Sequence, residues 1–184
     1  MFGGSFDPVH VGHLFVAEET RINLGYDQVV FVPAYQPPHK EDAPAASAAA
    51  RVEMLELALG GRRDFFIEDW EIRQRGISYT IDTVRHLYAT QPVEDRLGLI
   101  IGDDLLEGFY SWKDAETLEE LVDIIVATRK GEHGNGLSYR TIDNSPLPLS
   151  SSEVRERVRA GKAFRYLVPE SVYGYIRSNA LYHD

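Results

Sequence analysis

The chain has 184 residues with a formal net charge of −10, 43% hydrophobic and 26% charged residues, and no cysteine. The absence of cysteine excludes disulfide bonds, thiolate nucleophiles and cysteine-ligated metals, and the acidic balance argues against a nucleic-acid-binding protein, which usually carries a basic surface. The composition is typical of a soluble globular protein of one domain over residues 1–184, and no apolar run reaches the ~18 residues of a membrane span, so we expect a cytoplasmic protein without a signal peptide before Phe2.

The first distinctive stretch is residues 2–14, which read FGGSFDPVHVGHL. Phe2 is predicted to end a strand, and the two glycines after it allow a sharp turn and the close approach of a ligand. From His13 the apolar spacing becomes helical as far as Leu24. A glycine-bearing turn from strand to helix directs backbone N–H groups and the positive end of the helix at one point, and His10 and His13 add donors there. The stretch therefore predicts a phosphate site.

The rest of the chain alternates predicted strands with predicted helices. Short β-branched and aromatic runs predict strands at residues 29–33, 65–70, 97–101, 124–127 and 139–142. Apolar spacing predicts helices at residues 13–24, 48–59, 81–88, 118–122, 154–158 and 169–179, with Ser47 and Ser152 as N-caps. This alternation predicts an α/β fold with a doubly wound parallel sheet, which binds ligands beyond the carboxyl ends of its strands.

Four further blocks fall at these strand ends or helix starts. PPHK at 37–40 puts a cation on a loop stiffened by proline, although most such lysines are only solvated. SSSEVR at 150–155 combines hydroxyls, a helix start and an arginine, which makes it a second phosphate site or only a cap. GDD at 102–104 offers carboxylates to ribose hydroxyls or a metal. SYT at 78–80 opens a helix, and the lone Trp112 is by itself more typical of a core.

The blocks carry a resemblance to a known family. HVGH resembles the H-x-G-H motif of the nucleotidyltransferase superfamily, and the blocks together resemble the nicotinate mononucleotide adenylyltransferases. The matches, which span nearly the whole chain, are GGSFDPVHVGH, PPHK, SYTIDT, GDD with Trp112 eight residues on, Arg129-x-Gly131 and SSSEVR. The resemblance implies a Rossmann-like nucleotidyltransferase fold and adenylyl transfer from ATP to nicotinate mononucleotide, which gives nicotinate adenine dinucleotide and pyrophosphate in NAD biosynthesis.

The same resemblance implies roles for individual residues. It implies His10, His13 and Arg155 as the catalytic residues. The residues implied to bind ATP are Gly3, Gly4, Ser5, Phe6, His10, His13, Asp104, Ser151 and Arg155. The residues implied to bind the mononucleotide are Lys40, Thr80, Tyr110 and Trp112. Mg²⁺ is expected on the ATP phosphates, with few protein ligands and no metal-binding residue assigned.

The sequence departs from the family pattern at three places. Asp103 stands where a small residue is usual, and Ser152 stands where threonine is usual. The sequence also starts inside a central strand, so residues upstream of Met1 are expected, because a strand reduced to two residues would leave buried backbone groups unpaired.

Other functions stay open at this point. Phosphopantetheine adenylyltransferase shares the first and last blocks, while PPHK and SYTIDT favour the nicotinate enzyme. A non-catalytic nucleotide-binding protein would keep the same phosphate-contacting residues. A tRNA-synthetase fragment is disfavoured by the acidity and by the lack of an anticodon-binding region. No nucleic-acid or membrane partner is expected, and a homo-oligomer stays open.

Overall fold

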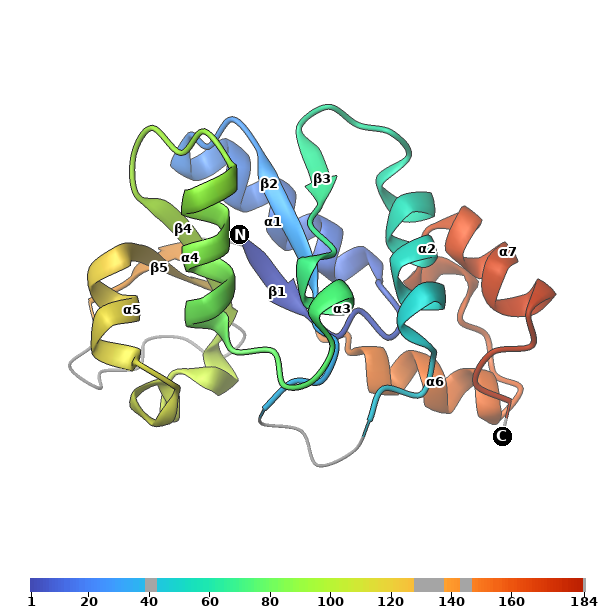
Figure 1. Cartoon of the computed structure of the whole chain (residues 1–184). Helices are drawn as coiled ribbons and strands as arrows, with labels where there is room; N and C mark the ends of the chain where they lie inside the picture. Colours follow the sequence, from blue (N-terminus) through green and yellow to red (C-terminus); the bar gives the residue numbers. More distant parts are fainter. Residues whose placement is uncertain (39–42, 128–137, 143–146, 184) are drawn as a thin grey trace.

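A computed structural model describes residues 1–38, 43–127, 138–142 and 147–183 (Figure 1). The described residues form one sheet of six strands in the order β3-β2-β1-β4-β5-β6, and all the strand pairs are parallel. The strands are β1 Phe2–Gly4, β2 Val29–Pro33, β3 Phe65–Ile67, β4 Leu97–Gly102, β5 Val122–Ala127 and β6 Arg140–Ile142. The predicted doubly wound parallel sheet is therefore confirmed.

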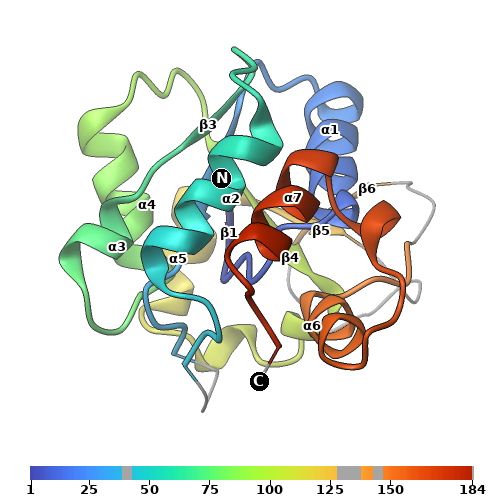
Figure 2. The same cartoon turned by 90° about the vertical axis from the view of Figure 1, so that its right-hand side faces the viewer.

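Helices cover both faces of this sheet. They are α1 Val11–Leu24, α2 Ala48–Leu59, α3 Trp70–Gln74, α4 Thr80–Thr90, α5 Ala115–Leu121, α6 Ser151–Arg159 and α7 Glu170–Ser178, with short 3₁₀ turns at Asp103–Leu105, Phe109–Ser111 and Arg165–Leu167. Figure 2 shows α7 beside α2, on the same side of the sheet as α1. Within the described part of the chain, no helix has both the length and the apolar character needed to cross a membrane.

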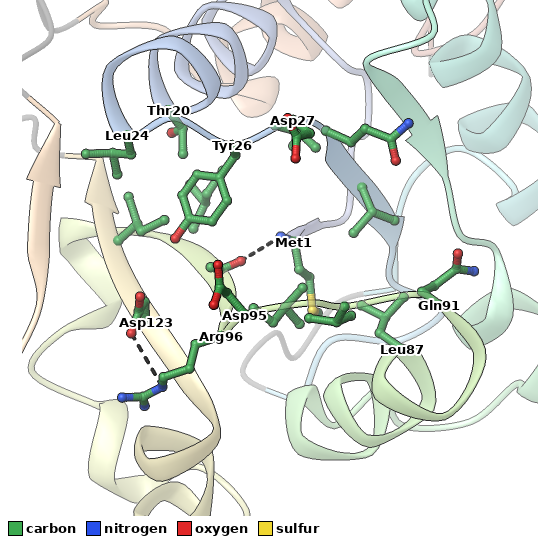
Figure 3. A pocket seen from close by; sticks show the side chains of 18 of the residues that line it. Met1, Thr20, Leu24, Tyr26, Asp27, Leu87, Gln91, Asp95, Arg96 and Asp123 are labelled. Atoms are coloured by element: carbon green, nitrogen blue, oxygen red, sulfur yellow. Dashed lines mark hydrogen bonds and ion pairs between the residues drawn. The ribbon is translucent and has the colours of Figure 1, made fainter.

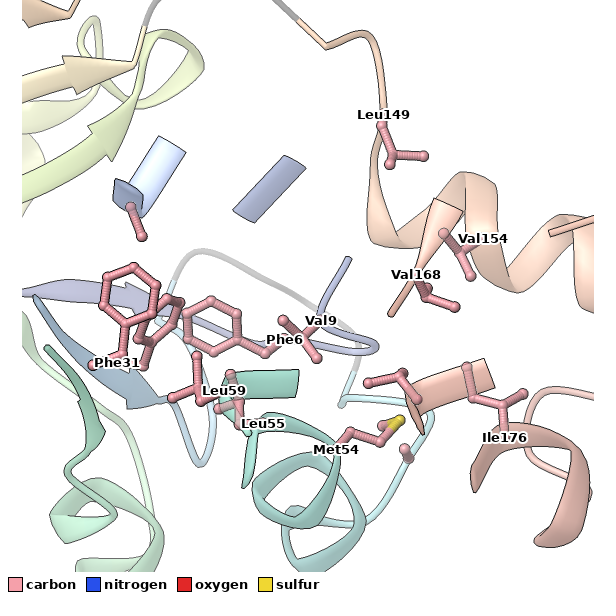
Figure 4. Close-up of a cluster of buried hydrophobic side chains, with 14 of the residues drawn as sticks. Phe6, Val9, Phe31, Met54, Leu55, Leu59, Leu149, Val154, Val168 and Ile176 are labelled. Carbon is pink, nitrogen blue, oxygen red and sulfur yellow. The ribbon is translucent and has the colours of Figure 1, made fainter. Parts of the chain in front are cut away.

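Two apolar cores lie on the two faces of the sheet. Neighbouring strand residues point to opposite faces, so Phe31 of β2 joins one core while Val30 and Val32 join the other. The first core, part of which is drawn in Figure 4, lies under α1, α2, α6 and α7, and the second lies under α4 and α5. Burial on both faces explains why the strands are short apolar runs without polar alternation.

The strand order reverses its direction beside β1, at the centre of the sheet. From β1 the chain winds outward through β2 and β3, then returns to the other side of β1 with β4 and winds outward to β6. The two crossovers beside β1 therefore leave in opposite directions, and in doubly wound folds such a reversal marks the ligand-binding crevice, at the carboxyl ends of the two central strands. The segments after β1 and β4 both lie there.

Several predicted boundaries are wrong, each for a local reason. The strand predicted at 65–70 stops at Ile67, because the Glu68 carboxylate accepts the N–H of Trp70 at 3.1 Å and turns the chain into α3. Val122, predicted in a helix, is extended and begins β5 directly after α5. The N-cap of α6 is Ser150, whose hydroxyl accepts the N–H of Glu153, so Ser152 lies in the first turn.

Other boundaries differ less, and some predictions cannot be compared. Helix α1 begins at Val11, two residues before the predicted start, because His10 caps it. The predicted cap Ser47 is confirmed, since its hydroxyl accepts the N–H of Ala50 at 3.2 Å. Lys40, Arg129 and Gly131 lie outside the described residues.

The amino ends of the central strands border a cavity of about 690 Å³, drawn in Figure 3. Met1 lies there, with its terminal amino group donating to the carbonyl of Gly98 at 2.6 Å and its own carbonyl accepting the N–H of Ile100. Burial lowers the pKa of this amino group from 8.0 to about 5. The cavity is at the end of the sheet opposite to the crevice, so it is not a candidate for the predicted phosphate chemistry.

Candidate active site

The start of α1 holds two histidines in a fixed mutual arrangement. The Nδ1 atom of His10 accepts the N–H of His13 at 3.3 Å, and the Nδ1 atom of His13 accepts the N–H of His10 at 3.2 Å. The two rings stack with centroids 3.6 Å apart. Because each Nδ1 is an acceptor, the proton of each neutral ring is on Nε2. The pair therefore presents two Nε2–H donors beside the N–H groups of the first helical turn.

The glycine between these histidines has a steric reason. A Cβ atom on Gly12 would lie 3.0 Å from Nδ1 and 3.1 Å from Cε1 of His10. Both distances are shorter than ordinary van der Waals contact, so a larger residue would displace the His10 ring. The H-x-G-H spacing thus permits the close pairing of the two imidazoles.

A buried aromatic ring anchors the turn between β1 and α1 in the apolar core. Phe6 has a left-handed backbone, with φ of 48°, and its ring packs against His13 at a centroid distance of 5.1 Å and against Phe31 at 5.6 Å. Figure 4 shows Phe6 between Phe31 and Val9 in the core. A Cβ atom on Gly4 would lie 3.3 Å from the Phe6 ring. The side chain of Phe6 therefore belongs to the core, and only its backbone is offered to a ligand.

Helix α6 meets this turn, so the two predicted phosphate sites lie together. The Arg155 guanidinium donates to the backbone carbonyl of Asp7 at 2.7 Å and to the hydroxyl of Ser152 at 3.0 Å. The hydroxyl of Ser151 donates to the carbonyl of Pro8 at 2.9 Å. The bonds to Asp7 and Pro8 join positions more than 140 residues apart. They place hydroxyls, an arginine and the α6 N-terminus beside the segment that leads to the histidine pair.

Two buried charged residues, which the sequence analysis missed, hold the same turn. The carboxylate of Asp7 accepts the N–H groups of Ala45 and Ala46, at 2.7 and 3.1 Å. Arg51 on α2, only 1% exposed, donates to the carbonyls of Ser5 and Ala34 at 2.7 Å each. Burial lowers the pKa of Arg51, while the nearby Asp7 raises it. Their partners come from distant segments, and a lone Asp or Arg in the sequence gives no signal for that.

The two aspartates after β4 take different positions. Asp103 is buried, whereas Asp104 is exposed. The Asp104 carboxylate lies close to the Cα atom of Gly102. A Cβ atom on Gly102 would lie 2.3 Å from Oδ1 of Asp104, so only glycine permits this position. The predicted ribose-binding Asp104 therefore lies at the carboxyl end of β4, the strand beside β1.

A small cavity of about 270 Å³ lies at the start of α4. Its lining residues are Pro38, Tyr79, Thr80, Ser111, Trp112 and Lys113. Two of the predicted substrate residues, Thr80 and Trp112, are thus brought together. Tyr110 is not among the lining residues, and its hydroxyl donates to Glu119 at 3.1 Å. Lys40 lies outside the described residues, although Pro38 lines the cavity.

Lys113 is a lining residue that the sequence analysis missed. Its ammonium group donates to the carboxylate of Asp82 at 2.8 Å and lies 4.7 Å from the centre of the Tyr79 ring. The bond to Asp82 raises the pKa of Lys113, so the side chain stays cationic at neutral pH. The one feature of the sequence that could have indicated Lys113 is that it directly follows Trp112, a predicted substrate residue.

Comparisons with known proteins identify the family of the chain. The cytidylyltransferase-like family model matches residues 1–157. A "probable nicotinate-nucleotide adenylyltransferase" of Borreliella afzelii is 40% identical over 184 residues, covering 99% of this chain and 95% of the relative. A protein of the same name from Treponema pallidum is 39% identical over 201 residues, covering 100% of this chain and 98% of the relative.

A solved structure shares the fold. The nicotinic acid mononucleotide adenylyltransferase of Plasmodium falciparum, complexed with NaAD, superposes with a TM-score of 0.80 at 20% identity, over 98% of this chain and 95% of that chain. At this identity the likeness concerns the fold, whereas the family follows from the sequence matches. The chain therefore belongs to the cytidylyltransferase-like family, among its nicotinate-nucleotide adenylyltransferases.

Proposed function

We propose that the chain transfers the adenylyl group of ATP to nicotinate mononucleotide, giving nicotinate adenine dinucleotide and pyrophosphate. The family assignment supports this reaction. The single observation that supports it in the structure is the histidine pair at the start of α1, in the turn to which the start of α6 is bonded through Ser151 and Pro8, because both offer donors suited to phosphate oxygens.

The chemistry requires one bond exchange at phosphorus. A phosphate oxygen of nicotinate mononucleotide forms a bond to the α-phosphorus of ATP, and the bond from that phosphorus to the pyrophosphate oxygen breaks. The attacking phosphate is largely ionised at neutral pH, so no general base has to remove a proton. The protein's task is then to position the two substrates and to stabilise the developing charge.

The site residues are proposed to divide this task by position. His10 and His13 donate from Nε2 to phosphate oxygens, and the backbone at residues 3–6 approaches the α-phosphate. Ser151 and Arg155 bind the β- and γ-phosphates at the start of α6. Asp104 accepts hydrogen bonds from the ribose hydroxyls at the end of β4.

Mg²⁺ on the ATP phosphates is part of the proposal. When bound, the ion neutralises charge on the triphosphate and its leaving pyrophosphate. The described residues contain no group of three or more His, Asp or Glu side chains arranged to hold a metal. The donors gathered at the crevice suit phosphate oxygens, which fits an ion held by phosphate and water.

The nicotinate ring is proposed to occupy the cavity at the start of α4. Trp112 would stack on the ring, and the N–H group at Thr80 would face its carboxylate. Tyr110 does not line the cavity, so no contact with the ring is proposed for it. Lys40 is proposed to contact a phosphate. We also propose a cytoplasmic reaction, because ATP is available there, and the oligomeric state is left open.

The test is a pyrophosphate-release assay with ATP and one of three acceptors: nicotinate mononucleotide, nicotinamide mononucleotide and phosphopantetheine. Nicotinate mononucleotide is expected to be the best acceptor. Faster release with phosphopantetheine would overturn the proposal. ATP binding by titration calorimetry with no release from any acceptor would indicate a non-catalytic nucleotide-binding protein.

A further inference from the structure

Helix α3 carries a buried carboxyl group that the proposed reaction does not use. Glu71 is 6% exposed, and its carboxylate accepts the hydroxyl of Thr83 on α4. Burial raises the pKa of Glu71, and the hydroxyls of Thr83 and of Ser78, just before α4, lower it. One side chain of α3 thus holds two points around the start of α4.

Ser78 extends this connection to a second loop. Its hydroxyl accepts the N–H of Tyr35 at 3.0 Å, and its backbone N–H donates to the carbonyl of Gln36 at 3.0 Å. Because a lone pair of the Ser78 hydroxyl accepts from Tyr35, its one proton is available to the nearby Glu71 carboxyl group. Ile77 and Gln36 also form an isolated parallel bridge. The loop after β2 and the segment before α4 are therefore fastened together.

Both fastened segments lead into the cavity at the start of α4. Pro38 follows the first segment by two residues, and Tyr79 and Thr80 follow the second directly. The rest of α4 is anchored independently, because its apolar residues Ile81, Val84 and Leu87 are in the core. Loss of the Glu71 bonds would consequently loosen the cavity wall while leaving the helix in place.

We propose that Glu71 is a positioning residue for mononucleotide binding, which holds the start of α4 against the loop after β2 through Ser78 and Thr83. This proposal rests on the proposed function, because that function assigns the cavity to the nicotinate ring. Glu71 touches no substrate, so its effect appears in the affinity for the mononucleotide and not in the chemistry at phosphorus.

The test compares Glu71→Ala with Glu71→Gln and with a matched control, Tyr88→Phe. Tyr88 lies toward the other end of α4, where its hydroxyl donates to the carbonyl of Leu121 at 2.7 Å and accepts the N–H of Leu97 at 2.9 Å. The control therefore removes two hydrogen bonds of the same helix away from the cavity. KM for each substrate, kcat and Tm are measured for every variant.

Glu71→Ala is expected to raise KM for nicotinate mononucleotide about tenfold or more, with KM for ATP within about twofold of the parent, because only one cavity wall is loosened. Glu71→Gln keeps an acceptor oxygen and is expected to restore part of the affinity. Tyr88→Phe is expected to lower Tm and to leave both KM values unchanged. Equal rises in both KM values, an unchanged KM for the mononucleotide, or the same KM change in Tyr88→Phe would overturn the proposal.

A second measurement does not depend on activity. Amide hydrogen exchange at Tyr35 and Ser78 is expected to quicken in Glu71→Ala and to stay unchanged in Tyr88→Phe. Ser78→Ala is also expected to quicken amide exchange at Tyr35. This variant replaces Glu71→Ala in the test if Glu71→Ala does not fold. If the parent protein released no pyrophosphate with nicotinate mononucleotide while exchange quickened as expected, the proposed function would fail and the positioning contact would stand. Unchanged exchange would overturn the contact itself.

Discussion

Tyr182 donates its hydroxyl proton to Oδ1 of Asp7 at 2.7 Å, which joins two residues 175 positions apart. Asp7 lies in the turn that leads to the histidine pair, and its backbone carbonyl accepts from Arg155. Burial and the Asp7 carboxylate raise the pKa of Tyr182, so its hydroxyl keeps its proton at neutral pH. The last residues of the described chain thereby stabilise the first turn of the candidate active site.

Tyr182→Phe is expected to destabilise the protein, because a buried carboxylate loses a donor. A hydrogen bond to a charged group contributes about 1.5–3 kcal/mol, and Asp7 keeps its two backbone donors. Urea unfolding measures the change in the free energy of unfolding. Tyr166→Phe is the matched control. Tyr166 is 87% exposed, so this substitution should leave the free energy of unfolding unchanged. Equal stability of the two variants would contradict the role assigned to this hydroxyl.

His13→Ala is expected to lower the turnover rate strongly without unfolding the protein. Loss of one preorganised donor to a phosphate oxygen costs roughly 2.7–4 kcal/mol in the transition state, or about 10²–10³ in kcat. Steady-state pyrophosphate release gives the rate, and circular dichroism checks the fold. His86 stacks on Trp70 away from the crevice, so His86→Ala is the control and should keep its kcat. Near-normal turnover by His13→Ala would rule out the proposed role of the pair.

Gly102→Ala is expected to weaken ATP binding. The new Cβ atom would occupy the space where Oδ1 of Asp104 lies, at 2.3 Å, and would turn that carboxylate away. KM for ATP should rise about tenfold or more, because a hydrogen bond to a charged acceptor contributes about 1.5–3 kcal/mol, with little change in KM for the mononucleotide. Gly174 in α7 has open space at its Cβ position, so Gly174→Ala should leave both constants unchanged. An unchanged KM for ATP in Gly102→Ala would argue against ribose binding by Asp104.

Much of the fold was predictable because it is encoded locally. Strand β2 is a continuous β-branched run closed by a proline, and α2 has a serine cap and terminal glycines, so the correct boundaries follow from neighbouring residues. The three consecutive serines at 150–152, where α6 starts, offer equally good caps by composition. The extended backbone of Ser150 decides among them, and the path of the incoming chain sets that backbone.

The candidate site was predictable to the extent that it lies in short contiguous blocks. The histidine pair, Ser151 and Arg155 each belong to such a block, and the structure brings the blocks together. Asp7, Arg51 and Tyr182 act through partners that are close only in the folded protein. Their roles could not be read from a sequence, because a buried charged residue has no local pattern.

A polypeptide that begins at Met1 is expected to become more stable as the pH rises from 5 to 8. The buried amino group has a pKa of about 5 when folded and 8.0 in the unfolded chain. Between these values the unfolded chain binds a proton that the folded chain does not, so the free energy of unfolding rises with pH. Acetylating the amino group, or adding residues before Met1, should remove this part of the dependence and raise Tm at pH 6. If the free energy of unfolding depends on pH in the same way with a free and with an acetylated amino group, the amino group is not buried.

The final prediction is a preference for nicotinate over nicotinamide mononucleotide. The two acceptors differ in a carboxylate against a neutral amide, and a carboxylate only accepts hydrogen bonds. The cavity at the start of α4 presents a helix N-terminus, and the Lys113 ammonium group also lines it. Charge-assisted hydrogen bonds contribute about 1.5–3 kcal/mol each, so kcat/KM should favour the acid by at least ~10².

Two variants separate the sources of this preference. Trp112→Ala should weaken both acceptors equally, because ring stacking does not depend on the substituent. Lys113→Met should reduce the preference only about two- to fivefold, since Lys113 is exposed and already paired with Asp82 at 2.8 Å. The comparison is made from kcat/KM for each acceptor at saturating ATP. Equal or better use of nicotinamide mononucleotide by the parent protein would contradict carboxylate recognition at this cavity, while adenylyl transfer itself would remain.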